Sequence, residues 1–261
     1  MKGWWGWVLS ELLVSLFAKI TILNMTMENL KNWMCIPADA DSDQINNAFD
    51  HIAECLKEKC VIRFEGKGYR ILDFEFYYYN MNHRDITVHP RNAEALTWYI
   101  NDFGGIDLNF KSDIEKVEVK KTKKNNTYVT YKYKLEPEGS PFFGGILIRR
   151  IQRIDDKCIF DSPLKVSELF RVFSAADQNH HLPILEISES PLEHIGFKQC
   201  TRHNLLGSHK GGDEEEIISK KVEYNISQCF TEVNPDLKSE LKEELKDFKG
   251  KLYRYCWDEL S

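Results

Sequence analysis

The stretch RILDFEFYYYNMNHRDITVHPRN, residues 70–92, sets an acidic side chain inside a run of aromatic ones. In an extended strand alternate side chains share a face, so one face carries the acid and the other is apolar. The first face holds Asp73, Glu75, Tyr77 and Tyr79, and the second holds Phe74, Phe76 and Tyr78. A carboxylate among aromatic rings is partly desolvated, which suits a general base that works near neutral pH. The alternative is that Glu75 forms an ion pair with a nearby arginine and has no chemical role.

The histidine and cysteine patterns indicate no metal site. His83 and His89 lie six residues apart around Asp85, a spacing that fits no common zinc motif, so we expect surface or packing roles for them. The seven cysteines are scattered and contain no CxxC pair, which indicates neither a disulfide framework nor a zinc knuckle. We therefore expect reduced thiols, an intracellular chain, no metal and no other cofactor.

Two groups of basic residues have an open interpretation. Arg149 and Arg150 end the apolar run 146–148, where they could contact a phosphate, orient a carboxylate or form structural ion pairs. The segment 116–135 interleaves tyrosines with Lys120, Lys121, Lys123, Lys124, Lys132 and Lys134. Such a run is either a local basic and aromatic surface for nucleic acid or a solvated hairpin.

Local patterns predict the elements that position these side chains. Helices are predicted at 41–59, at 161–173 and at 234–251, from capping residues, prolines at helix starts and apolar residues at helical spacing. Strands are predicted within 60–80 and 95–110, in a hairpin at 116–137, at 144–154 and at 252–257. Residues 207–227 are rich in glycine and acidic residues and are predicted to form a surface loop or a partly ordered insertion.

Composition and charge bound the class of protein. The chain has 261 residues, of which 42% are hydrophobic and 29% charged, as in globular proteins with a full core. Its formal net charge of −6 argues against nucleic-acid binding over the whole surface, so any basic face is local. No linker or internal repeat divides residues 28–261, which are expected to form one mixed domain.

Residues 1–27 are largely apolar and have three interpretations. They are a signal or membrane anchor, a packed N-terminal helix, or the result of a start assigned too early, with Met25 or Met27 as the true start. Glu11 interrupts the apolar run, and the uninterrupted part is too short to span a bilayer. We draw no functional expectation from this segment.

Seven segments, taken in order, resemble the alkyladenine (3-methyladenine) DNA glycosylase family. They lie between Ile62 and Trp257 and read DFEFYYY, HRDITVHPRN, WYINDFGGIDLNF, GGILIRRI, DSPLKVSELF, CTRHNL and LYRYCW. The resemblance implies an α+β fold: a single mixed domain whose curved, mostly antiparallel sheet forms a barrel like the formyltransferase C-terminal domain, flanked by helices. It also implies excision of alkylated or deaminated purines by base flipping and attack of water on C1′ of the deoxyribose.

Carried over by position, the resemblance assigns roles to ten residues. Glu75 is implied to be the general base that activates the attacking water, and Arg149 to lie near that water. The residues implied to bind the flipped nucleotide are Tyr77, which stacks on the base, His89, Phe103 as the wedge that fills the gap in the duplex, and Asn109. The residues implied to contact nucleic acid are Arg91, Arg150, Lys165 and Arg202.

The resemblance further implies a partner and a setting. The partner is double-stranded DNA with a damaged purine, bound by a monomer without a metal or membrane, in the cytoplasm or at a nucleoid. The chain departs from the family pattern at 161–165, 200–204 and 101–105, which are DNA-facing and pocket parts. Two alternatives therefore stay open: an inactive relative that only binds a nucleic acid or a partner, and a hydrolase of a small nucleoside-like substrate.

Overall fold

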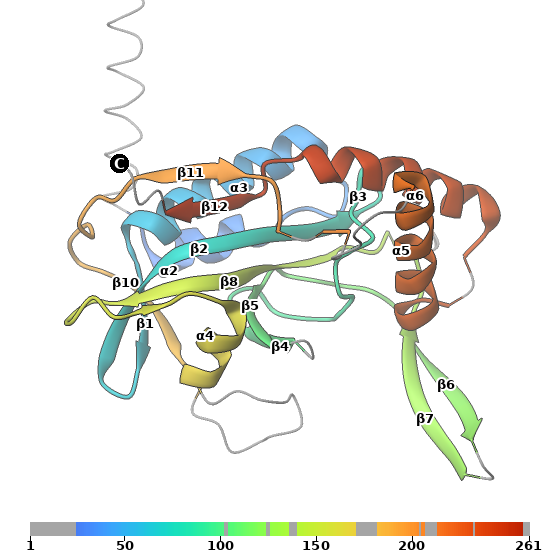
Figure 1. Ribbon diagram of the computed structural model, residues 1–261, viewed down its shortest axis with the longest axis horizontal. Coiled ribbons are helices and arrows are strands. Elements are labelled where there is room, and N and C mark those ends of the chain that lie inside the picture. Colours follow the sequence, from blue (N-terminus) through green and yellow to red (C-terminus); the bar gives the residue numbers. More distant parts are fainter. Residues whose placement is uncertain are drawn as a thin grey trace, which may run out of the picture.

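The computed structural model describes residues 25–101, 104–123, 126–135, 140–170, 182–203, 205–206, 213–231 and 233–257. These residues form a ten-stranded sheet, a separate two-stranded hairpin and five helices (Figure 1). The strands of the large sheet are β1 (Cys60–Phe64), β2 (Lys67–Asn80), β3 (His83–Arg84), β4 (Trp98–Asn101), β5 (Gly105–Asn109), β8 (Phe143–Arg153), β9 (Ile159–Phe160), β10 (Ile184–Ile187), β11 (Phe197–Cys200) and β12 (Arg254–Trp257). The hairpin is β6 (Lys116–Lys123) with β7 (Asn126–Tyr133), and the helices are α2 (Met27–Trp33), α3 (Ser42–Glu58), α4 (Pro163–Leu169), α5 (Glu214–Cys229) and α6 (Pro235–Gly250).

The long strands β2 and β8 form the centre of the large sheet. They pair in antiparallel fashion from Tyr69 to Tyr79 of β2, and β5 and β4 extend the sheet beyond β8. On its other edge β2 pairs with β1, β12 and β3 at successive positions. The pairings among the described strands of this sheet are antiparallel, so the predicted mixed α+β class with a mostly antiparallel sheet is confirmed.

The alternation predicted along β2 separates the core from the opposite face. Phe74, Phe76 and Tyr78 are buried on the side that α3 covers, and the ring of Phe76 stacks on Phe49 of α3 with 4.3 Å between centroids. The opposite side of β2 carries Glu75. Because burial of the aromatic side chains holds the backbone of β2 in register, the apolar face positions the carboxylate on the other face.

The expectation of a closed barrel is wrong. The backbone pairing path of the described strands runs β10-β1-β2-β8-β5-β4 and ends at β10 and β4, so the sheet is open. The indole N–H of Trp98 in β4 donates a 2.6 Å hydrogen bond to the carbonyl of Pro183, which directly precedes β10. In a closed barrel β4 and β10 would pair through backbone hydrogen bonds, whereas here a side-chain hydrogen bond joins the two edges.

The capping residues place the predicted helices correctly. Asp41 caps α3 in a capping box with Gln44, Ser162 caps α4, and Asn234 caps α6. The predicted surface loop at 207–227 is wrong from residue 214 on, because α5 begins there, and residues 207–212 lie outside the described residues. Asp213 caps α5 and the acidic residues that follow lie in its first turn, where the helix dipole favours negative charge.

The two C-terminal helices lie together at one end of the sheet (Figure 1). Ion pairs join them at three points: Glu214 with Lys249, Glu215 with Lys246, and Glu223 with Lys238. Residues 1–24, which hold most of the apolar N-terminal segment, lie outside the described residues. Within the ranges that are described, no helix has the length and apolar character needed to cross a membrane.

Candidate functional site

Glu75 is a fully buried carboxylate surrounded by hydrogen-bond donors. Its Oε1 atom accepts a hydrogen bond from the backbone N–H of His203 at 2.7 Å and lies 3.3 Å from Nη1 of Arg149. Its Oε2 atom accepts a hydrogen bond from the hydroxyl of Tyr77 at 2.5 Å. Burial of a carboxylate is costly unless such partners replace its lost hydration. The sequence analysis offered an ion pair between Glu75 and a nearby arginine as an alternative to a chemical role, and Arg149 makes that contact. The ion pair does not by itself exclude a chemical role for Glu75.

One row of side chains crosses the sheet through Glu75. The strand register aligns Arg254, Glu75, Leu147, Asp107 and Tyr99, which lie on β12, β2, β8, β5 and β4. Residues directly opposite one another in antiparallel strands share a face. The Nε atom of Arg254 lies 3.8 Å from Oε1 of Glu75, and its guanidinium also binds Asp73 at two points. The row thus places two buried carboxylates, Glu75 and Asp107, on either side of Leu147.

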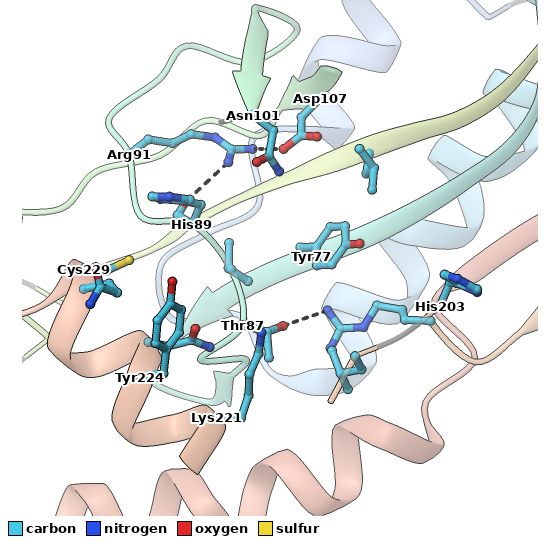
Figure 2. Close-up of a pocket in the computed structure, with 16 residues that line it drawn as sticks. Tyr77, Thr87, His89, Arg91, Asn101, Asp107, His203, Lys221, Tyr224 and Cys229 are labelled. Carbon is cyan, nitrogen blue, oxygen red and sulfur yellow. Dashed lines mark hydrogen bonds and ion pairs between the residues drawn. The ribbon is translucent and has the colours of Figure 1, made fainter. Parts of the chain in front are cut away.

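A cavity of about 430 Å³ lies against this face of the sheet (Figure 2). The sheet contributes Tyr77, Asp107 and Leu147 to its wall, and α5 forms the wall on the other side. Tyr77 and His203, which hold Glu75, both line the cavity. The buried carboxylate therefore lies directly behind the cavity wall.

Arg202 is a buried cation in this wall. Its Nη1 atom donates to Oδ2 of Asp85 at 2.5 Å, and both side chains are fully buried. The guanidinium carbon lies 4.9 Å from the ring centroid of Tyr77, an arrangement that favours a cation–π contact. Its Nε and Nη2 atoms are buried and have no hydrogen-bond partner in the part of the chain that the structure describes. Unused donors at a cavity wall mark a position where a ligand can supply acceptors.

Arg91 is built into the sheet at another part of the wall. Its Nε atom donates to Oδ1 of Asn109 at 2.6 Å and its Nη2 atom donates to Asp107 at 3.2 Å, while the guanidinium lies 4.1 Å from the ring of Tyr99. A Cβ atom at position 145 would overlap Nη2 of Arg91, so Gly145 leaves the space that the guanidinium occupies. Figure 2 shows Arg91 reaching toward Asp107 beside His89.

Burial changes the proton affinity of several groups that line the cavity, Tyr77, Asp107 and Lys221 among them. Burial and the negative charge of Glu75 raise the pKa of Tyr77, so its hydroxyl stays protonated and able to donate. Burial also raises the pKa of Asp107, although Arg91 opposes that effect. Burial lowers the pKa of Lys221 on α5, so the amine of Lys221 loses its proton more easily than that of an exposed lysine.

Ion pairs neutralise most of the charges around the cavity. The pairs are Arg149 with Glu75, Arg254 with Asp73, Arg202 with Asp85, and Arg91 with Asp107. Lys221 lines the same cavity and forms no ion pair with any residue in the described ranges. The wall thus carries one cation beyond those that its own carboxylates balance.

Most of the ten residues implied by the resemblance meet at this site. Tyr77, His89, Arg91 and Arg202 line the cavity, and Glu75 and Arg149 lie in contact with each other behind it. Because Arg91 and Arg202 are buried, they face a ligand inside the cavity rather than phosphates on an open surface. Phe103 lies outside the described residues.

Three of the implied residues lie away from the cavity wall. Asn109 is buried in β5, where it accepts from Arg91 and donates to Thr97, so it positions an arginine instead of lining the cavity. Lys165 is exposed on α4 and pairs with Asp161 at 2.7 Å. Arg150 on β8 is not among the cavity residues.

Sequence reasoning missed the wall that α5 provides. Lys221, Tyr224 and Asn225 line the cavity from this helix, in a segment that was expected to be a loop. The helical signal was the acidic start at Asp213 followed by apolar residues four apart, Ile218 and Val222.

The packing role expected for His83 is confirmed. Its Nδ1 atom lies 2.9 Å from the carbonyl of Tyr78 and its Nε2 atom 3.0 Å from the hydroxyl of Tyr253, and the side chain is buried. Among the described residues no group of three or more His, Cys, Asp and Glu side chains could hold a metal ion.

Comparison with known proteins gives one relative. The chain is 31% identical over 129 residues to an uncharacterized protein of Acanthamoeba polyphaga mimivirus. The match covers 47% of this chain and 56% of the viral protein. No protein-family model and no solved structure matches the chain.

Proposed function

We propose that the chain is a DNA glycosylase that removes alkylated or deaminated purines from duplex DNA. One observation carries the proposal: a fully buried carboxylate, Glu75, lies behind the wall of a cavity that Tyr77, His89 and Arg202 line. The cavity volume of about 430 Å³ falls within the range of small-ligand pockets. The segment order described above adds the resemblance to alkyladenine DNA glycosylases.

The proposed reaction begins when the damaged nucleotide leaves the base stack and enters the cavity, at a cost of a few kcal/mol. The ring of Tyr77 contacts the face of the base. A water molecule held by Glu75 and Arg149 attacks C1′ of the deoxyribose while the bond from C1′ to the base nitrogen breaks. Glu75 accepts a proton from this water, and the base departs with the bonding electrons and takes up a proton from solvent, to which Glu75 later releases its own.

The contacts of Glu75 leave acceptor positions on its oxygens unfilled, and because the side chain is fully buried, a water reaches them when a neighbour such as Tyr77 moves. A carboxylate has about four acceptor positions on its two oxygens. Oε2 accepts from Tyr77, while Oε1 accepts from His203 and faces Arg149. These fixed donors hold the carboxylate in one orientation, which lowers the cost of organising the site during the reaction.

The complete burial of Glu75 favours a second candidate function. In that alternative the carboxylate only organises Tyr77 and the loop that carries His203, and the protein binds nucleic acid without cleaving the glycosidic bond. The two functions make opposite predictions for base release by the folded wild-type protein. A hydrolase of small nucleosides is distinguished by its indifference to duplex DNA and to salt.

The test is base release from duplex oligonucleotides that contain one hypoxanthine, 1,N6-ethenoadenine or 3-methyladenine. Abasic sites are measured by alkaline cleavage of the labelled strand, with the matching free nucleosides assayed in parallel. Release from at least one duplex, absent in a Glu75→Gln preparation purified in the same way, supports the glycosylase. Release from free nucleosides alone supports the small-substrate hydrolase, and binding of duplex without any release supports the inactive relative.

A further inference from the structure

The β6–β7 hairpin has a positive net charge, whereas the rest of the chain has a negative one. Residues 116–133, which form the hairpin, contain six lysines and one glutamate, whereas the whole chain has a formal net charge of −6. Lys116 and Lys120 are exposed on one face of the hairpin, and Nζ of Lys116 lies 3.8 Å from the ring centroid of Tyr131. The basic and aromatic pattern seen in the sequence is thus gathered on one ribbon.

This hairpin extends away from the body of the protein (Figure 1). Its two strands pair with each other over eight residues, and no third strand of the described chain joins them. Val129 is 47% exposed and Tyr131 is 52% exposed. An isolated two-stranded ribbon is marginally stable in water, so a ribbon with exposed apolar and cationic side chains gains stability from a partner.

The base of the hairpin is attached beside the cavity. Tyr133 forms a bridge with Phe230, and its carbonyl accepts a 2.9 Å hydrogen bond from the backbone N–H of Thr231. Cys229, the neighbour of Phe230 at the end of α5, lines the cavity. A molecule that places one group in the cavity therefore has its flanking parts within reach of the hairpin.

We propose that the β6–β7 hairpin is an arm that binds the phosphate backbone of duplex DNA next to the cavity. The choice of duplex DNA rests on the proposed function. Eight residues of strand span about 26 Å, which is the length of about eight base pairs. The exposed ammonium groups of Lys116 and Lys120 can contact phosphates from one face of the ribbon, and a two-stranded ribbon fits the major groove.

The arm accounts for DNA binding by an acidic protein. A net charge of −6 repels DNA in general, so a projecting arm with six lysines can hold the duplex while the acidic body stays apart from it. The cavity residues Arg91 and Arg202 are buried and paired with Asp107 and Asp85, so they do not supply this surface charge.

The test compares two triple variants with equal loss of charge. One replaces Lys116, Lys120 and Lys132 by Gln on the hairpin; the other replaces Lys67, Lys157 and Lys198, three exposed lysines on other elements. Affinity for an undamaged 20-base-pair duplex is measured by fluorescence anisotropy from 50 to 200 mM salt. The hairpin variant is expected to bind about 100-fold more weakly, with a salt slope smaller by about three, and the control is expected to stay within threefold of wild type.

The outcomes separate this inference from the proposed function. Because the DNA is undamaged, binding through the hairpin is measured even if no base is ever released. Equal affinity of the hairpin variant and the wild type overturns the inference, as does equal weakening by both triple variants. Absence of duplex binding by the wild type, or self-association that depends on the hairpin lysines, also overturns it, the latter in favour of a second copy of the chain as the partner.

Discussion

The hydroxyl of Tyr77 donates a 2.5 Å hydrogen bond to Oε2 of Glu75, two residues earlier on the same face of β2. Burial and the charge of Glu75 raise the pKa of Tyr77, so this donor is kept protonated at neutral pH. The same ring lines the cavity and lies beneath the guanidinium of Arg202. Tyr77 thus joins the buried carboxylate to the cavity.

Replacement of Tyr77 by Phe removes the donor and keeps the ring. A hydrogen bond to a charged group contributes about 1.5–3 kcal/mol, so the rate of base release is expected to fall about 10- to 100-fold with little change in DNA affinity. Tyr79 on the same strand is the matched control, because its buried hydroxyl has no hydrogen-bond partner among the described residues. Tyr79→Phe is expected to leave the rate and the stability unchanged; an equal effect of both substitutions would contradict a specific role for Tyr77.

Replacement of Asp85 by Asn leaves the Arg202 guanidinium buried without its counter-ion. Breaking one partner of a buried ion pair costs about 3–5 kcal/mol, and the free energy of unfolding measured in urea is expected to fall by that amount. Asp156→Asn provides the control, since its pair with Arg153 involves an exposed carboxylate that solvent screens, so its loss is expected to change the stability far less. Similar losses for the two variants would show that Arg202 does not depend on Asp85.

Replacement of Gly145 by Ala inserts a methyl group where the Arg91 guanidinium lies. Overpacking in a filled site costs about 1–3 kcal/mol, and the displaced guanidinium loses its contacts with Asp107 and Asn109. We expect a lower midpoint of thermal unfolding together with weaker ligand binding in the cavity. Gly250→Ala, where an added Cβ would meet no atom within 4 Å at the end of α6, is expected to leave ligand binding unchanged and not to lower the midpoint, because Ala favours a helix over Gly.

His83 makes stability depend on pH. Burial lowers its pKa below the ordinary value of about 6.5, with Asp85 opposing and Arg202 assisting this effect. The unfolded chain therefore binds a proton below about pH 6.5 that the folded chain refuses, so His83 costs no stability above that pH and reduces stability as the pH falls below it. The loss has a limiting slope of about 1.4 kcal/mol per pH unit for this one group.

Urea unfolding between pH 7.5 and 5 measures this effect. A His83→Gln variant is expected to be less stable at pH 7.5, because the substitution disturbs the hydrogen bonds of His83 with Tyr78 and Tyr253. It is also expected to lose less stability on acidification than the wild type. His194→Gln removes a histidine whose side chain is 83% exposed and is expected to keep the wild-type pH dependence. The same slope in the His83 variant and the wild type would assign the pH dependence to other groups.

Local patterns predicted the parts of the site that depend on residues close together in the sequence. The period of two along β2 placed Glu75 opposite the aromatic core, and the capping residues located α3, α4 and α6. Arg149 contacts Glu75, which agrees with the expectation from the sequence that it could orient a carboxylate, while its place near an attacking water stays a prediction. These features depend on alternation and on segment order, which are visible in a single sequence.

The missed features depend on contacts between distant residues. Arg202 binds Asp85, 117 positions away, and no local pattern encodes which arginine will be buried with which acid. The wall formed by α5 was missed because the sequence around its start is rich in glycine and acidic residues. That composition was taken to indicate a loop, although Asp213 is a helix-capping residue. The barrel was expected from the resemblance alone, whereas the strand pairing that decides between an open and a closed sheet is a long-range property.

The central claim is that Glu75 activates the water that cleaves the glycosidic bond. The most direct measurement is single-turnover base release from a damaged duplex by the wild type and by Glu75→Gln, with duplex affinity and thermal unfolding recorded on the same preparations. The account predicts that the folded variant binds the duplex within about threefold of the wild type and releases the base at least about 100-fold more slowly. Base release at the wild-type rate by Glu75→Gln, or unfolding of this variant, would contradict the catalytic role of Glu75.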